Sequence, residues 1–215
     1  MKPRTKALAS LASLARTAAG LLLALAGAAG AQQPGHLLAP HLQPGKPLPQ
    51  LPECPRSEQQ GRWVYTAPQP ATECAEALVA AQRPLGSANE VRRIFLAQPP
   101  ALSKEPRINV EVQGGTLVST VVITRGLATQ VQDVEALARI YGPPTTRKWV
   151  SEQLEATGKS AEVLNAEWMR PDGSLLIFWG LTEDAETGGL GIYSPAQARE
   201  ILAERKREAS AGKKE

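Results

Sequence analysis

Cys54 and Cys74 carry the most reactive side chains of this chain. A cysteine nucleophile needs a neighbouring base to take its proton, and the two histidines, His36 and His41, both stand in a proline-rich stretch. Paired cysteines in an exported chain are typical of a disulfide, which would stabilise the fold by about 3 kcal/mol. We therefore expect a structural Cys54–Cys74 bridge, with a catalytic or metal-binding thiol as the alternative.

Two short motifs resemble ligand-binding loops, and both are incomplete. Residues 156–160 end in Gly-Lys-Ser, but a phosphate-binding loop needs a further glycine where Gln153 stands. Glu183, Asp184 and Glu186 offer carboxylate oxygens for Ca²⁺, without the alternating spacing of a calcium loop. We expect solvated polar turns at both places, and we predict no metal and no cofactor.

Carboxylates are the remaining candidates for acid–base chemistry. Glu152 with Glu155, and Glu167 with Asp172, form two possible pairs. One member of such a pair must lie in an apolar pocket to act as a general acid, and sequence spacing does not show this. With neither a nucleophile–base set nor a recognisable catalytic spacing, we predict no catalytic residue.

Trp149 is the best candidate for a binding residue. It directly follows two basic residues, Arg147 and Lys148, whereas Trp168 and Trp179 belong to apolar strand-like segments and are expected in the core. Tryptophan and arginine dominate binding hot spots in protein interfaces. We expect an exposed Trp149 that contacts a partner, with a position at the edge of the core as the alternative.

Most of the elements that must position these residues follow from local patterns. Residues 108–113 alternate apolar and polar side chains, Gly114-Gly115 is a hairpin turn signal, and residues 116–124 are β-branched almost throughout. This predicts a β-hairpin.

A helix is predicted next, over residues 129–141. Thr129 and Gln132 have the spacing of a capping box, Asp133 falls on the polar face, and Gly142 with two prolines after it ends the helix.

The rest of the chain supplies further strands and helices. Three strands are expected over residues 163–169, 174–181 and 190–193, a short helix over 72–82, and a final helix from Ser194 and Pro195. Residues 145–160 are ambiguous between helix and strand. The order of elements predicts an α+β fold with an antiparallel β-sheet and helices packed on one face.

Residues 1–31 are typical of a secretory signal peptide. Basic residues precede an Ala/Leu/Gly-rich run, which Ala29-Gly30-Ala31 closes with a small-x-small cleavage site. The run is shorter than the roughly 20 apolar residues that span a bilayer. We expect the mature chain to begin at Gln32 and to be periplasmic or secreted, without a membrane anchor.

After the signal, composition divides the chain into a linker and one domain. Residues 32–52 contain six prolines and no periodic pattern, which predicts an extended, unpaired linker with solvated histidines. Residues 53–208 are expected to form a single α+β domain, and residues 209–215 a charged tail.

Charge excludes one class of partner. Four of the 24 basic residues and none of the 21 acidic residues lie in residues 1–31, which leaves 20 basic and 21 acidic residues in the mature chain. A nucleic-acid-binding domain is strongly basic, so we expect none here.

Residues 137–145 read Leu-Ala-Arg-Ile-Tyr-Gly-Pro-Pro-Thr and follow a predicted β-hairpin, and residues 51–55 read Leu-Pro-Glu-Cys-Pro. With these segments the chain resembles a group of small secreted bacterial proteins of unknown function, and the resemblance covers about residues 45–195. A looser likeness exists to outer-membrane assembly lipoproteins of the small-protein-A type and to β-lactamase-inhibitor-like domains. These likenesses imply the fold and bring no catalytic residues.

Two functions follow as hypotheses. The first is a non-catalytic binding domain for a periplasmic protein or envelope component. The second is a carboxylate-based hydrolase or lyase that acts on cell-wall material.

Overall fold

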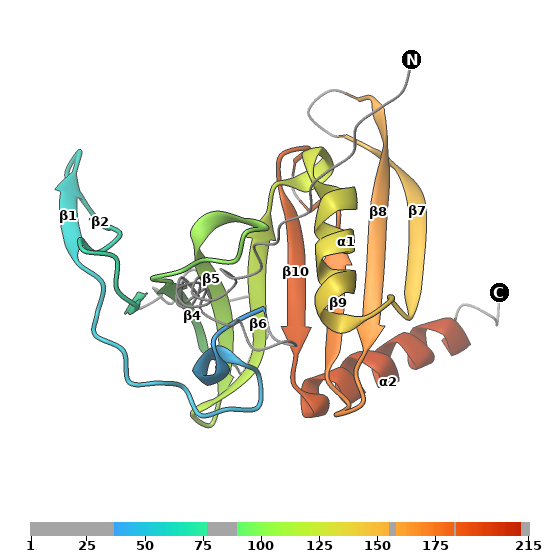
Figure 1. Ribbon diagram of the computed structural model, residues 1–215, viewed down its shortest axis with the longest axis horizontal. Coiled ribbons are helices and arrows are strands. Elements are labelled where there is room, and N and C mark those ends of the chain that lie inside the picture. The colour runs from blue at the N-terminus through green and yellow to red at the C-terminus, as the bar shows by residue number, and fades with distance from the viewer. Residues whose placement is uncertain (1–36, 77–89, 155–157, 183, 212–215) are drawn as a thin grey trace, which may run out of the picture. The chain divides into compact units, whose positions relative to one another are not determined.

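The predicted α+β class is confirmed by the computed structural model, which describes residues 37–76, 90–154, 158–182 and 184–211 (Figure 1). An eight-stranded antiparallel sheet has the order β3-β4-β5-β6-β10-β9-β8-β7, and β1 and β2 form a separate two-stranded sheet. The strands are β1 (Arg56–Gln59), β2 (Arg62–Tyr65), β3 (Cys74–Glu76), β4 (Glu90–Phe95), β5 (Ser103–Gln113), β6 (Thr116–Thr124), β7 (Thr146–Gln153), β8 (Ser160–Met169), β9 (Leu175–Trp179) and β10 (Gly188–Tyr193). The helices are α1 (Gln130–Tyr141) and α2 (Pro195–Ala211), with 3-10 turns η1 (Pro40–Leu42) and η3 (Gly126–Ala128).

The central hairpin matches its local sequence signals. β5 and β6 pair as predicted, and the turn between them uses positive φ at Gly114 and Gly115, 56° and 76°. The three predicted later strands are confirmed as β8, β9 and β10, and β10 pairs with both β6 and β9. No helix of the described residues is long and apolar enough to cross a membrane.

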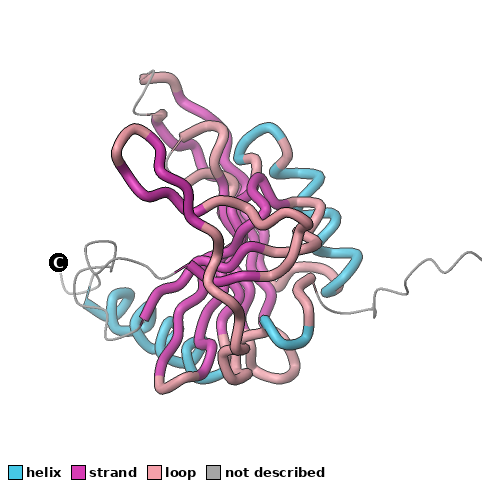
Figure 2. Tube along the Cα trace, turned by 90° about the vertical axis from the view of Figure 1, so that its left-hand side faces the viewer, coloured by secondary structure: helices cyan, strands magenta, loops and turns pink. Residues whose placement is uncertain are grey.

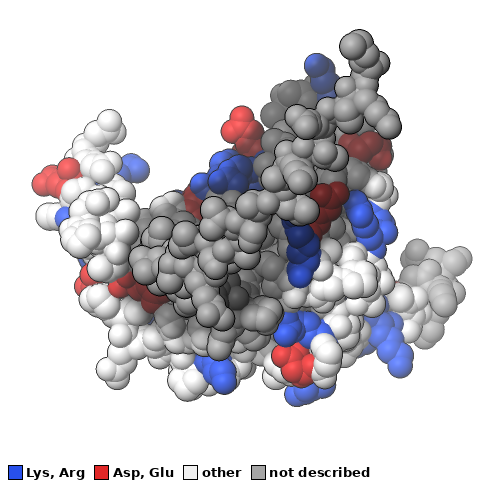
Figure 3. Space-filling view, in the orientation of Figure 1, with Lys and Arg blue, Asp and Glu red and all other residues white. Residues whose placement is uncertain are grey.

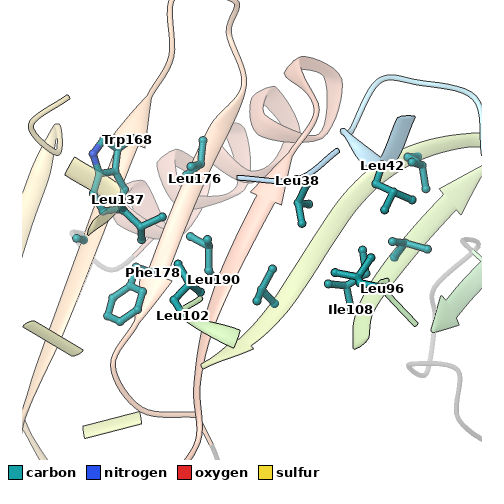
Figure 4. Packing of buried hydrophobic residues seen from close by; sticks show 14 of the residues in the cluster. Leu38, Leu42, Leu96, Leu102, Ile108, Leu137, Trp168, Leu176, Phe178 and Leu190 are labelled. Atoms are coloured by element: carbon teal, nitrogen blue, oxygen red, sulfur yellow. The ribbon is translucent and has the colours of Figure 1, made fainter. Parts of the chain in front are cut away.

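The two helices lie on opposite faces of the sheet, rather than on one face as predicted (Figure 2). Successive strand residues point to opposite faces. In β9, Leu176 and Phe178 therefore pack in the core cluster with Leu137 of α1 (Figure 4), whereas Leu175 and Ile177 pack with Ala198 of α2. The nearly all-apolar β9 sequence is that of a strand buried on both faces.

The start of α1 differs from the predicted capping box. Thr129 makes no side-chain cap; its hydroxyl donates instead to Asp133 Oδ2, at 2.7 Å. Asp133 is buried rather than solvated, and this burial raises the pKa of Asp133 against the effect of the Thr129 hydrogen bond. A local motif therefore gives way to a polar contact beneath the helix.

Gln130 attaches α1 to the sheet. Its Oε1 accepts from Leu164 N at 2.7 Å, and its Nε2 donates to Glu162 O at 3.0 Å, both in β8. Gly180 leaves the space for this side chain, because a Cβ there would lie 2.3 Å from Gln130 Oε1. The helix is thus held by side-chain hydrogen bonds to the β8 backbone as well as by its apolar face.

The described part of the predicted linker, residues 37–52, is folded onto the sheet. Leu38 and Leu42 are buried in the core cluster, and Leu117 N of β6 donates to Lys46 O at 2.8 Å. Apart from η1 the segment has no helix or strand of its own. Its leucines leave water by packing on the sheet, and this burial stabilises the folded segment over an extended, unpaired one. The prediction of a free linker is wrong for this segment.

The predicted helix over residues 72–82 is wrong at its start. Cys74–Glu76 is strand β3, which pairs with β4, and residues 77–82 lie outside the described residues. The Cys54–Cys74 disulfide is confirmed, with an S–S distance of 2.08 Å, and Cys54 N donates to Ala75 O at 3.0 Å. Tertiary pairing thus overrides a local helix signal.

Candidate functional site

β7 is the strand at one edge of the eight-stranded sheet (Figure 1). It pairs over its whole length with β8, from Thr146 opposite Glu167 to Gln153 opposite Ser160. This pairing resolves residues 146–153 of the ambiguous segment as a strand. Seven of its eight residues are exposed, and within the described chain its other side pairs with no strand. β7 therefore presents a row of backbone donors and acceptors along an open edge.

The register shows which predicted binding residues share a face. Trp149 lies opposite Leu164, and Arg147 opposite Ala166. Leu164 and Ala166 belong to the core on the α1 side, so Arg147 and Trp149 point to that side, since paired residues share a face. Lys148 points to the other face. The structure thus brings Arg147 and Trp149 together and separates Lys148 from them.

Trp149 is exposed, as predicted, with 49% of its surface accessible. An indole that is half accessible on an edge strand combines a large apolar area with a nearby guanidinium, Arg147. This is the composition of an interface hot spot. Its binding role stays a prediction.

Trp63 marks a second exposed aromatic surface that the sequence patterns did not single out. It lies on β2, is 69% exposed, and is opposite Glu58 of β1. The turn between the strands uses positive φ at Gln60 and Gly61, so this Gln-Gly pair was the signal available in the sequence. At the base of the hairpin, Tyr65 packs beside the disulfide.

A small pocket lies between the N-terminal segment and the β8–β9 turn. Leu38, Tyr141 and Arg170 are among its lining residues, and its volume is about 60 Å³. The Arg170 guanidinium stacks over the Tyr141 ring at 5.0 Å, and Leu37 N donates to the Tyr141 hydroxyl. The pocket has room for a few water molecules, far below the roughly 300–1,000 Å³ of pockets that enclose drug-sized ligands.

Glu167 and Asp172 do not form the acid–base pair considered from the sequence. Glu167 is ion-paired with Arg205 of α2 at 3.0 Å. Asp172 lies in the β8–β9 turn, where burial opposes its ionisation but hydrogen bonds from Ser174 hold the pKa of Asp172 below its ordinary value. A general acid needs a raised pKa. Glu155, the partner considered for Glu152, lies outside the described residues.

The candidate acidic loop, residues 183–186, is an ordinary turn where the structure describes it, and residues 156 and 157 of the Gly-Lys-Ser segment lie outside the described residues. Asp184 Oδ1 accepts from Glu186 N at 2.9 Å, and Lys104 Nζ donates to Glu186 O; Glu183 lies outside the described residues. Among described residues, no three His, Cys, Asp or Glu side chains gather as a metal site.

His41 contacts an acidic side chain rather than lying free in solvent as predicted for a linker residue. Its Nε2 lies 2.6 Å from Glu73 Oε2 at the surface. His36 lies outside the described residues.

Basic and acidic side chains are interspersed on the face shown in Figure 3.

Comparison of this chain with protein-family models, curated proteins and solved structures found no match.

Proposed function

We propose that this chain is an exported, non-catalytic binding domain that takes up an extended segment of a partner protein along β7. One observation carries the proposal: an eight-residue edge strand, open on one side in the described chain, presents a half-exposed tryptophan beside an arginine. Extended segments add to such edges through backbone hydrogen bonds, and side-chain pockets supply the specificity.

The edge lacks most of the features that usually protect a sheet from pairing. β7 contains charged side chains, which are one such feature, but it contains no proline, is not shortened, and pairs with β8 without a bulge. Natural proteins cover or interrupt long edge strands because these strands otherwise pair with other chains. An open edge of this length is explained most simply by a partner that completes the sheet.

Export is supported by two features at different places in the chain. The Cys54–Cys74 bridge persists in oxidising compartments, and the composition of residues 1–31 is that of a signal peptide. The resemblance to small secreted bacterial proteins points to the same compartment and remains a prediction.

The hydrolase hypothesis has less support. The pocket lined by Tyr141 is too small for a cell-wall sugar or peptide, and the larger hollow of about 430 Å³ is an open surface along α2 that contains neither Glu167 nor Asp172. The candidate carboxylates Glu167 and Asp172 bind other groups. No described geometry favours that reaction, and the hypothesis stays a prediction.

Trp149→Ala tests the binding proposal directly. We expect the variant to fold, because the side chain is half exposed. Its affinity for a protein that the wild type captures should fall at least tenfold, which is the effect of truncating a hot-spot residue. The measurement is capture from a periplasmic extract, quantified by mass spectrometry, with circular dichroism to check folding.

Trp63→Ala is the matched control, because it removes a more exposed tryptophan elsewhere on the surface. We expect this variant to capture the same proteins as the wild type. A folded Trp149→Ala variant that keeps every partner would overturn the proposal.

A further inference from the structure

We infer, on the basis of the proposed function, that the strand bound by β7 is β7 of a second copy of this chain. The two strands would pair antiparallel about a two-fold axis that lies midway between the two copies of Val150. This pairing would give one continuous sheet across both copies. The evidence is the charge order along β7, which is complementary to itself in this arrangement.

Symmetry limits the registers that two β7 strands can adopt. A two-fold axis perpendicular to the sheet keeps the α1 faces of both copies on the same side. Directly opposed residues must share a face, and alternate residues along a strand do so. The axis must therefore place one residue directly opposite its own copy, as Val150 opposite Val150. It cannot lie level with the middle of a peptide bond between two successive residues. Below, the axis is named by the residue that lies opposite its own copy.

Charge selects one of these registers. β7 reads Thr-Arg-Lys-Trp-Val-Ser-Glu-Gln, with its cations at the start and its carboxylate near the end. An axis at Val150 places Lys148 of each copy opposite Glu152 of the other copy, so two ion pairs form. An axis at Lys148 opposes two lysines, and an axis at Trp149 places Lys148 opposite Val150.

These two charges have no ion pair inside the described chain. Within β8, Lys148 lies opposite Asn165, and Glu152 lies opposite Ala161; neither side chain belongs to any ion pair of the described residues. The same register sets Trp149 opposite the small Ser151 of the second copy. The exposed indole would then be covered by the neighbouring strand, and Lys148 would gain a role on the opposite face.

The dimer should be of moderate affinity. A single pair of eight-residue strands buries an area at the low end of specific interfaces, and exposed cross-strand ion pairs contribute weakly. We expect a dissociation constant in the micromolar range, so association is followed by sedimentation equilibrium at protein concentrations up to about 500 µM.

Charge reversal tests this arrangement with the full mature chain. Lys148→Glu and Glu152→Lys each turn two attractive pairs into two repulsive pairs, and each variant should weaken dimerisation about tenfold or more. An equimolar mixture of the two variants should dimerise as the wild type does, because both cross-strand pairs are then attractive. Arg62→Glu on the β2 hairpin makes the same charge change as Lys148→Glu and should leave dimerisation unchanged.

The outcomes separate this inference from the proposed function. A wild type that stays monomeric to 500 µM, or single variants whose mixture stays as weak as each alone, would overturn the β7–β7 dimer. If Trp149→Ala still abolished capture of a different protein, the proposed function would stand without the dimer. If the chain dimerised as predicted, its own copy should be among the captured proteins.

Discussion

Replacing Gly126 by alanine should lower the free energy of unfolding by about 2–5 kcal/mol, combining backbone strain with overpacking. Gly126 has φ of +60°, a region that L-residues enter at a cost. An added Cβ would lie 2.5 Å from Ala185 O and 2.6 Å from Thr187 N, and both are backbone atoms that cannot rotate away. Urea denaturation of the purified variant gives the value.

Gly115→Ala separates the two contributions to this loss. Gly115 also has a positive φ, +76°, but nothing lies within 4 Å of its ideal Cβ. This variant should lose only about 1–2 kcal/mol, the strain alone. Equal losses in both variants would contradict the close packing of η3 against the segment before β10.

Loss of the disulfide should have an effect of similar size. The bridge ties Cys54, which precedes the β1–β2 hairpin, to Cys74 in β3. We expect the double variant Cys54→Ala/Cys74→Ala to lose about 2–5 kcal/mol, because its unfolded chain is no longer cross-linked. In the wild type, neither cysteine should be alkylated unless a reducing agent is added, as mass spectrometry of the alkylated protein would show.

Reduction of the wild-type protein provides the control. Dithiothreitol should move the wild-type urea midpoint close to that of the double variant and leave the variant itself unchanged. A wild-type midpoint that does not respond to complete reduction would show that the bridge contributes nothing to stability.

The predictable parts of this fold are those whose local signals agree with their final pairing. The β5–β6 hairpin has alternation and a glycine turn, and α1 has a helical apolar stripe with Gly142 as its stop. In both cases each residue's preferred conformation is also the one that buries its apolar side chain. Such agreement between local and global preferences can be recognised without knowing the rest of the chain.

The parts that escaped prediction depend on distant partners. β7 is polar and nearly all exposed, so its strand conformation comes from pairing with β8 rather than from its own pattern. β3 has three residues and is held by β4 and the disulfide. Leu38 and Leu42 stand in a proline-rich segment, and they are buried because they pack in the core cluster with residues of the sheet. None of these contacts leaves a periodic signal.

The candidate site was foreseen in part. The exposure of Trp149, which directly follows two basic residues, was predicted. The position of Lys148 on the opposite face was not, because the strand conformation of residues 146–153 did not follow from the sequence. Trp63 was missed because four-residue strands are too short for alternation to be recognised. The buried Gln130 depends on an acceptor and a donor in β8 that only the folded chain supplies.

Site-specific photo-crosslinking in cells that export the protein to the periplasm tests the central claim most directly. A benzophenone amino acid replaces the exposed Ser151 of β7, which leaves Trp149 in place, or, as the control, the exposed Met169 of β8. If β7 binds a partner strand, position 151 should yield a discrete adduct with another polypeptide, identifiable by mass spectrometry, and position 169 should not. A folded protein that gives no adduct at position 151, or the same adducts at both positions, would contradict the claim that β7 is the binding edge.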